Sequence, residues 1–149
     1  MLEKLFYTEA SLLLTLLRLV LGLVILPHGL QKLAGMFGGY GYSATLDFFK
    51  SEGIPYAVGF LVIVAESFGA LGLILGLFTR ISSFGIGLTM IGAAIYVRKN
   101  GFFMNWFNQQ AGEGFEYHIL AIGIAVILMV AGGGSFAADS WIANKIQSN

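Results

Sequence analysis

Two charged residues interrupt stretches of sequence that are otherwise continuously apolar. Arg18 lies in the stretch 11–31 and Glu66 lies in the stretch 56–78. A charge inside a hydrocarbon layer costs about 3 kcal/mol or more, so each of these residues needs a partner or a function. At 1.5 Å per residue their depths differ by roughly 6 Å, which two long side chains can bridge. The two residues therefore predict either a structural ion pair between helices or a proton- or ligand-binding site.

His28 and Lys32 stand four residues apart, just after Pro27. If the helix continues past the proline, both side chains lie on one helix face. A histidine can donate a hydrogen bond to a quinone oxygen and relay a proton near neutral pH. A lysine can stabilise negative charge that develops on such a ligand. The alternative interpretation is that Lys32 extends to the lipid headgroups and His28 lies in the interface.

Glu116 and His118 open the last apolar stretch. Residues two apart point to nearly opposite sides of a helix, so only one should face the other helices. We favour Glu116, although a carboxylate at a helix start also has a purely stabilising role. The two histidines could ligate a haem, but nothing else in the sequence supports one. Too few ligands are in register to predict a zinc or iron site.

The composition is that of a membrane protein. Hydrophobic residues make up 57% of the 149 residues and charged residues only 11%, against about 25% in soluble domains. Eight basic and eight acidic residues cancel, which argues against a nucleic-acid partner. The absence of cysteine excludes thiolate catalysis and cysteine-ligated iron–sulfur clusters. The 21 glycines indicate closely packed helices or an oligomer face.

These features predict an all-α, four-helix transmembrane bundle that forms one domain over residues 1–149. Each apolar run is close to the length that crosses a hydrocarbon layer of about 30 Å. The spans are expected at about 11–31, 56–78, 81–97 and 117–134.

Two of the connections between the spans have a predicted local structure. Residues 43–51 predict a short interfacial helix anchored by Leu46, Phe48 and Phe49. Thr79 and Arg80 are expected to form a tight turn between the second and third spans.

Four crossings place both termini on one side of the membrane. The basic residues near the spans are almost equal in number on the two sides, so the positive-inside rule does not decide the orientation. We expect the inner (plasma) membrane, with both termini in the cytoplasm. The residues counted are Lys4, Arg80 and Lys145 on the terminal side and Lys32, Lys50, Arg98 and Lys99 on the other.

Three sequence patterns together resemble the DoxX family of small membrane proteins. The first, R-x3-G-x6-G-x2-K, runs from Arg18 to Lys32, and the second, E-x2-G-x2-G-x3-G-x3-R, runs from Glu66 to Arg80. The third is the segment G-G-G-S-F-A-A-D, which ends at Asp139. The resemblance covers nearly the whole chain. It departs from the family pattern at Gly133, where a proline is expected in many members.

The resemblance implies a four-span inner-membrane protein associated with oxidoreductases. A related DoxD-type subunit belongs to a thiosulfate:quinone oxidoreductase, and other members look like membrane anchors for redox enzymes. We therefore expect a membrane component of a redox system, and, if it is an enzyme, a quinone-linked oxidoreductase subunit. The expected roles are proton handling by His28, Glu66 and Glu116 and quinone binding by Arg18, Lys32 and His118.

The chain has no redox centre of its own, so electron transfer would need a bound quinone or a partner redox subunit. A homo-oligomer is also compatible with the glycine pattern. Two other functions remain open. One is that of a non-enzymatic anchor that docks a partner through its aromatic segment from Phe102 to Phe107. The other is that of a small proton-coupled transporter that uses Glu66.

Overall fold

The first long helix, α2 (Leu12–Ala34), runs through Pro27 without stopping. The structure is a computed structural model that describes residues 5–148, so Lys4, which was counted for the orientation, lies outside the described residues. The Ser11 hydroxyl accepts a hydrogen bond from the Leu14 amide and begins the helix. Gly35 ends it in the left-handed conformation, with φ of 69°. His28 and Lys32 therefore lie one turn apart on one face, as predicted.

The second apolar stretch is not one regular helix. It consists of α4 (Tyr56–Val64), a π-helical turn η2 (Ala65–Gly69) and α5 (Ala70–Leu75). The predicted span 56–78 is too long, because Gly76 and Phe78 adopt φ of 65° and 50° and end the helix.

The turn predicted at Thr79 and Arg80 is wrong. The turn lies at residues 76–78, and α6 (Thr79–Val97) already begins at Thr79, to be continued by a short 3-10 turn, η3 (Arg98–Asn100). The physical reason is a cap from a distant residue. The Asp139 carboxylate accepts hydrogen bonds from the Phe78 and Thr79 amides, at 2.7 and 2.8 Å, and so satisfies the first amides of α6.

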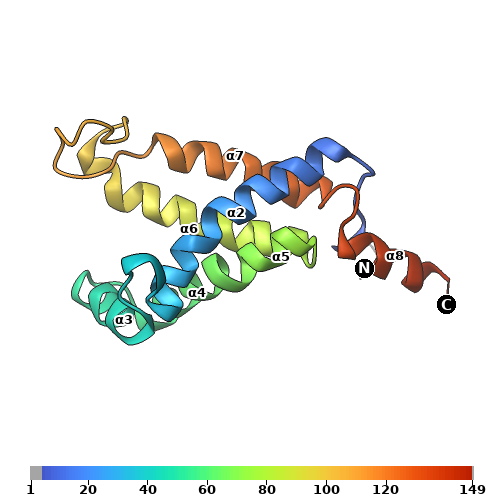
Figure 1. Ribbon diagram of the computed structural model, residues 1–149, viewed down its shortest axis with the longest axis horizontal. Coiled ribbons are helices and arrows are strands. Elements are labelled where there is room, and N and C mark those ends of the chain that lie inside the picture. The colour runs from blue at the N-terminus through green and yellow to red at the C-terminus, as the bar shows by residue number, and fades with distance from the viewer. Residues whose placement is uncertain (1–4, 149) are drawn as a thin grey trace.

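The last apolar helix, α7 (Glu116–Ala131), is shorter than the predicted span 117–134. Gly132, with φ of 87°, ends it, and the glycine run is a buried loop. This loop leads to α8 (Ala138–Gln147), which lies at the same end of the molecule as the first described residues (Figure 1).

The short helix predicted at residues 43–51 is present as α3 (Tyr42–Ser51) and follows a 3-10 turn, η1 (Met36–Gly38). It packs on α4 rather than standing alone, because Gly59 leaves room for the side chains of Leu46 and Phe49. The helix α3 lies at the end of the molecule opposite α8, as does the connection 101–115 (Figure 1).

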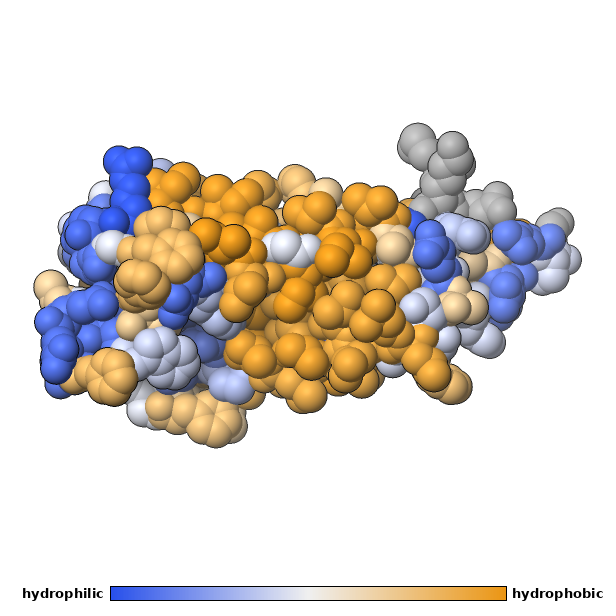
Figure 2. All heavy atoms as spheres, turned by 90° about the horizontal axis from the view of Figure 1, so that it is seen from above, coloured by the Kyte–Doolittle hydropathy of each residue, from blue (hydrophilic) through white to orange (hydrophobic). Residues whose placement is uncertain are grey.

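The hydrophobic core joins four helical segments, α2, α5, α6 and α7, which lie side by side (Figure 1). Three helices in the part of the chain that the structure describes are long and apolar enough to cross a membrane, and α7 is a shorter apolar helix. On the face that Figure 2 shows, an apolar belt crosses the middle of the molecule and hydrophilic residues gather at both ends. The protein is therefore an all-α, multi-pass membrane protein. The three long candidates are Leu12–Ala34, Tyr56–Leu75 and Thr79–Asn100.

Candidate functional site

Arg18 and Glu66 do not form the ion pair that their depths allow. The buried Arg18 guanidinium instead donates to four main-chain oxygens. It thereby satisfies the last carbonyls of α5 and fixes the glycine loop after α7. The predicted ion pair between Arg18 and Glu66 is therefore wrong. The four acceptors are the carbonyls of Leu73 (2.8 Å), Ile74 (2.6 Å), Gly133 (2.8 Å) and Phe136 (3.1 Å).

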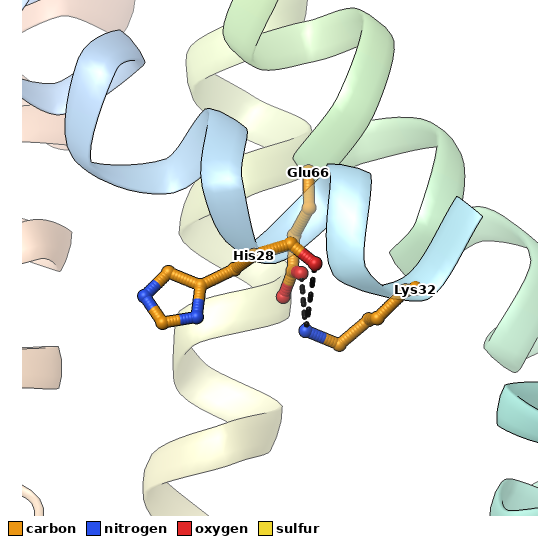
Figure 3. A network of polar contacts seen from close by, with 3 residues as sticks. All are labelled: His28, Lys32 and Glu66. Carbon is orange, nitrogen blue, oxygen red and sulfur yellow. Dashed lines mark hydrogen bonds and ion pairs between the residues drawn. The ribbon is translucent and has the colours of Figure 1, made fainter. Parts of the chain in front are cut away.

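Glu66 pairs with Lys32 instead. The Lys32 Nζ lies 2.6 Å from the Glu66 Oε2, and the two side chains are 26% and 6% exposed. The same ammonium group reaches the main-chain oxygen of His28 at 3.5 Å (Figure 3). Because the carboxylate is almost completely buried, the lysine supplies the compensating charge that its burial requires.

The local chain geometry explains why these groups meet. Glu66 lies in the π-helical turn η2, and such turns inside α-helices occur frequently at functional sites. Gly29 of α2 lies directly against the main chain of Glu66, where any side-chain atom would overlap. This close approach brings Lys32, which follows Gly29 by one turn, within reach of the carboxylate.

The Lys32–Glu66 pair opens into a cavity of about 450 Å³. Its wall is mainly apolar and includes Ile25, Phe49 and Met90, and its polar groups come from α2, η2, α6, the connection 101–115 and α7. This volume falls within the range of ligand sites, and an apolar wall with a few polar groups is typical of them. The polar lining residues are His28, Lys32, Glu66, Thr89, Tyr96, Glu113, Tyr117 and His118.

Two polar atoms of α7 remain without a partner in this cavity. The Tyr117 hydroxyl and the His118 Nδ1 are buried and have no hydrogen-bond partner among residues 5–148. A buried polar atom without a partner costs about 1–3 kcal/mol, so such atoms indicate a bound ligand or water. From the sequence, Tyr117 belongs to the layer of polar and aromatic residues at this membrane face, but no individual role was predicted for it.

Glu116 was favoured over His118 as the residue that faces the other helices, but the structure shows the reverse at the cavity. His118 lines the cavity. The Glu116 carboxylate accepts hydrogen bonds from the Met104 amide (3.1 Å) and the Trp106 indole (3.3 Å). Glu116 therefore holds the aromatic segment 102–107, and the preference for it as the residue facing the cavity is wrong.

The structure thus brings together four of the six predicted site residues. His28, Lys32, Glu66 and His118 line one cavity, whereas Arg18 and Glu116 do not. Within residues 5–148, no group of three or more histidine, aspartate or glutamate side chains is placed to hold a metal ion.

Comparison with known proteins agrees with the sequence patterns. The DoxX family model matches residues 13–99, more than half of the chain. The chain belongs to the DoxX family. This DoxX protein is also 32% identical over 127 residues to a Bacillus subtilis (strain 168) protein named "Putative oxidoreductase CatD", covering 85% of this chain and 84% of the relative. No solved structure matches it significantly. The matched family region contains Lys32, Glu66 and the α6 wall of the cavity.

Proposed function

We propose that this DoxX protein is a membrane component of a redox system and binds a quinone in the cavity beside Glu66. The observation that carries the proposal is that one apolar cavity is lined both by a partly buried ion pair and by a tyrosine whose hydroxyl has no partner among the described residues. A quinone has a flat apolar ring with polar oxygens at its edge, which suits such a cavity. The oxidoreductase name of the Bacillus relative points in the same direction.

The residues of the cavity have distinct tasks in this proposal. A bound quinone supplies the electron- and proton-accepting chemistry. The Lys32 ammonium group stabilises negative charge near the ligand, and the Glu66 carboxylate accepts or returns a proton. The imidazoles of His28 and His118 exchange protons between the cavity and the nearby hydrophilic end of the molecule. Arg18 and Glu116 act indirectly, by fixing the helix ends and the aromatic segment. Electrons come from a partner redox subunit, because the chain offers no redox centre of its own.

We further propose that α2, α4–α5, α6 and α7 cross the inner (plasma) membrane as a four-helix bundle, with the termini in the cytoplasm. Support comes from the apolar belt in Figure 2 and from the location of α3 and α8 at opposite ends of the molecule (Figure 1). Because the chain has no cysteine, Ala44→Cys and Ser148→Cys give single labelling sites. A membrane-impermeant thiol reagent should reach the first from outside and the second only after lysis. The opposite result reverses the orientation, and labelling of both from one side excludes four crossings.

The quinone proposal is tested by purification in mild detergent followed by spectroscopy. The ultraviolet spectrum should contain a quinone band that bleaches on chemical reduction. If the quinone is lost on purification, titration with a soluble naphthoquinone should fill the site again. Glu66→Gln and Lys32→Met should weaken binding about tenfold each, since each removes one charged hydrogen-bonding partner.

Matched controls separate the cavity from general charge effects. Glu9 and Lys50 are exposed, and neither lines this cavity. Glu9→Gln and Lys50→Met should therefore bind the quinone as the native protein does. Equal affinity in Glu66→Gln, Lys32→Met and the native protein would remove the proposed site.

A second candidate function is that of a membrane anchor for a redox enzyme. The aromatic segment favours it, because Phe103, Trp106 and Phe107 are 67%, 78% and 83% exposed although they are large and apolar. Co-purification of a stoichiometric soluble subunit that is lost in a Phe103→Ser/Phe107→Ser double variant would support this function. Quinone binding with no such subunit favours the first proposal.

A further inference from the structure

The hydroxyl of Tyr117 is one of two buried polar groups, on residues lining the cavity, that lack a partner within residues 5–148. Tyr117 lies in the first turn of α7, and its ring makes an edge-on contact with the His118 ring, with centroids 5.5 Å apart. The hydroxyl is buried and has no partner among the described residues. A buried polar group without a partner, on a residue that lines a cavity, is a group to which a ligand oxygen can bind.

The packing of the helices separates Tyr117 from the ion pair. Both α2 and α6 pack against η2 on one side and against α7 on the other. The Glu66-bearing turn and α7 are therefore on different sides of α6. Figure 1 shows the same order, with α4 and α5 on one side of α6 and α7 on the other.

Each of the two sides carries both a donor and an acceptor of hydrogen bonds. On one side Lys32 can only donate and the ionised Glu66 can only accept, whereas the Tyr117 hydroxyl on the other side does both. A ring carbonyl only accepts hydrogen bonds and a ring hydroxyl can also donate one. The cavity therefore has partners for a ligand oxygen on both sides, whether the ligand is oxidised or reduced.

We propose that Tyr117 binds one ring oxygen of the ligand while the Lys32–Glu66 pair binds an oxygen on the opposite edge of the ring. The inference rests on the proposed function and narrows its ligand to para-quinones and the corresponding para-hydroquinones. The aromatic residues Phe48, Phe49 and Tyr96 in the cavity wall offer flat apolar surfaces for the ring.

Calorimetric titration of the full-length protein in detergent tests this arrangement with two soluble probes. 1,4-Naphthoquinone has oxygens on opposite ring edges, whereas 1-tetralone has a similar bicyclic frame and a single carbonyl. The native protein should bind the naphthoquinone roughly fivefold or more tightly, the equivalent of one additional hydrogen bond. Tyr117→Phe should weaken naphthoquinone binding by the same factor and leave tetralone binding, through Lys32, unchanged.

The control is Tyr40→Phe, since Tyr40 is 80% exposed and lies outside the cavity. Tyr117→Phe should also keep or raise the melting temperature of the ligand-free protein, because it removes a buried hydroxyl without a partner. A fall in that temperature would show that the hydroxyl is bound within the protein and would overturn the inference.

The remaining outcomes distinguish a failure of the proposed function from a failure of the role inferred for Tyr117. If the native protein binds neither probe, the proposed function fails. If it binds naphthoquinone and only the Glu66→Gln and Lys32→Met variants weaken that binding, the proposed function holds and the role of Tyr117 is overturned. Equal affinity of the native protein for both probes would also overturn the inference that the ligand is bound at two opposite edges of its ring.

Discussion

Gly29 of α2 lies directly against the main-chain carbonyl of Glu66, one helical turn before Lys32. No side chain fits at this contact, so the glycine fixes how closely α2 approaches the π-helical turn. The 2.6 Å contact between Lys32 and Glu66 follows from this approach. The ion pair in the cavity is thus a consequence of backbone packing as well as of charge.

Gly29→Ala should separate α2 from η2 and weaken both the fold and the ligand site. Overpacking of this kind costs about 1–3 kcal/mol. We expect a lower melting temperature in detergent and weaker quinone binding in the fraction that folds. Gly123→Ala is the matched control, because nothing lies within 4 Å of the added methyl group and the helix should be unchanged or slightly more stable. Equal melting temperatures for the two variants would show that the contact at Gly29 is not tight.

Arg18→Met should destabilise the protein without acting on the cavity directly. Four main-chain oxygens lose a charged donor, at a cost of about 3 kcal/mol or more. Thermal unfolding should begin at a lower temperature, while the folded fraction still binds quinone. A variant with native stability and no quinone binding would instead restore Arg18 to the binding role predicted from the sequence.

Asp139→Ala should loosen the junction between α5, α6 and α8. The substitution removes the acceptor of the Phe78 and Thr79 amides, and the loss of such a cap costs about 1–2 kcal/mol. Asp47→Ala, at an exposed position of α3, should leave the melting temperature unchanged. Asp139→Asn, which keeps a side-chain oxygen, should fall between Asp139→Ala and the native protein; an Asn variant as unstable as the Ala variant would point to the charge rather than the cap.

Glu116→Ala should release the aromatic segment 102–107. The carboxylate holds the Met104 amide and the Trp106 indole, so its loss frees a segment whose phenylalanines chymotrypsin can cut. We expect limited proteolysis at Phe103 or Phe107 to accelerate several-fold, and no acceleration in Glu9→Gln. Unchanged cleavage would mean that the second carboxylate contact, from Glu113 to the Asn105 amide, is sufficient to hold the segment.

The apolar runs predicted the helices well, but their ends depended on contacts with distant residues. Hydropathy placed the second span through residue 78, whereas Gly76 ends the helix and Asp139, some 60 residues away in the sequence, begins the next one. The glycines after Ala131 looked like part of a span because glycine is compatible with a membrane helix. The structure shows instead that they form a loop, which begins at the left-handed Gly132 and is held by Arg18 contacts to Gly133 and Phe136.

The candidate site was predictable in its residue types but not in its pairings. His28, Lys32 and Glu66 were identifiable as polar residues in apolar runs. The ion pair between Glu66 and Arg18, one of the two alternatives predicted from their depths, requires regular helices and leaves out the main-chain oxygens that Arg18 binds instead. The π-helical turn at Glu66 has no clear sequence signal, and Tyr117 was expected only in the same layer as the site, since its lack of a partner is visible only in the structure.

The most direct test of the central claim is photolabelling with an azidoquinone, followed by mass spectrometry of the labelled peptides. The cavity has walls from distant parts of the chain, so label should appear around Ile25, Met90 and Met104 and disappear with excess unlabelled naphthoquinone. Glu66→Gln should reduce the labelling of all three regions together. Label confined to the exposed apolar belt, or unaffected by competitor, would contradict a quinone site in this cavity.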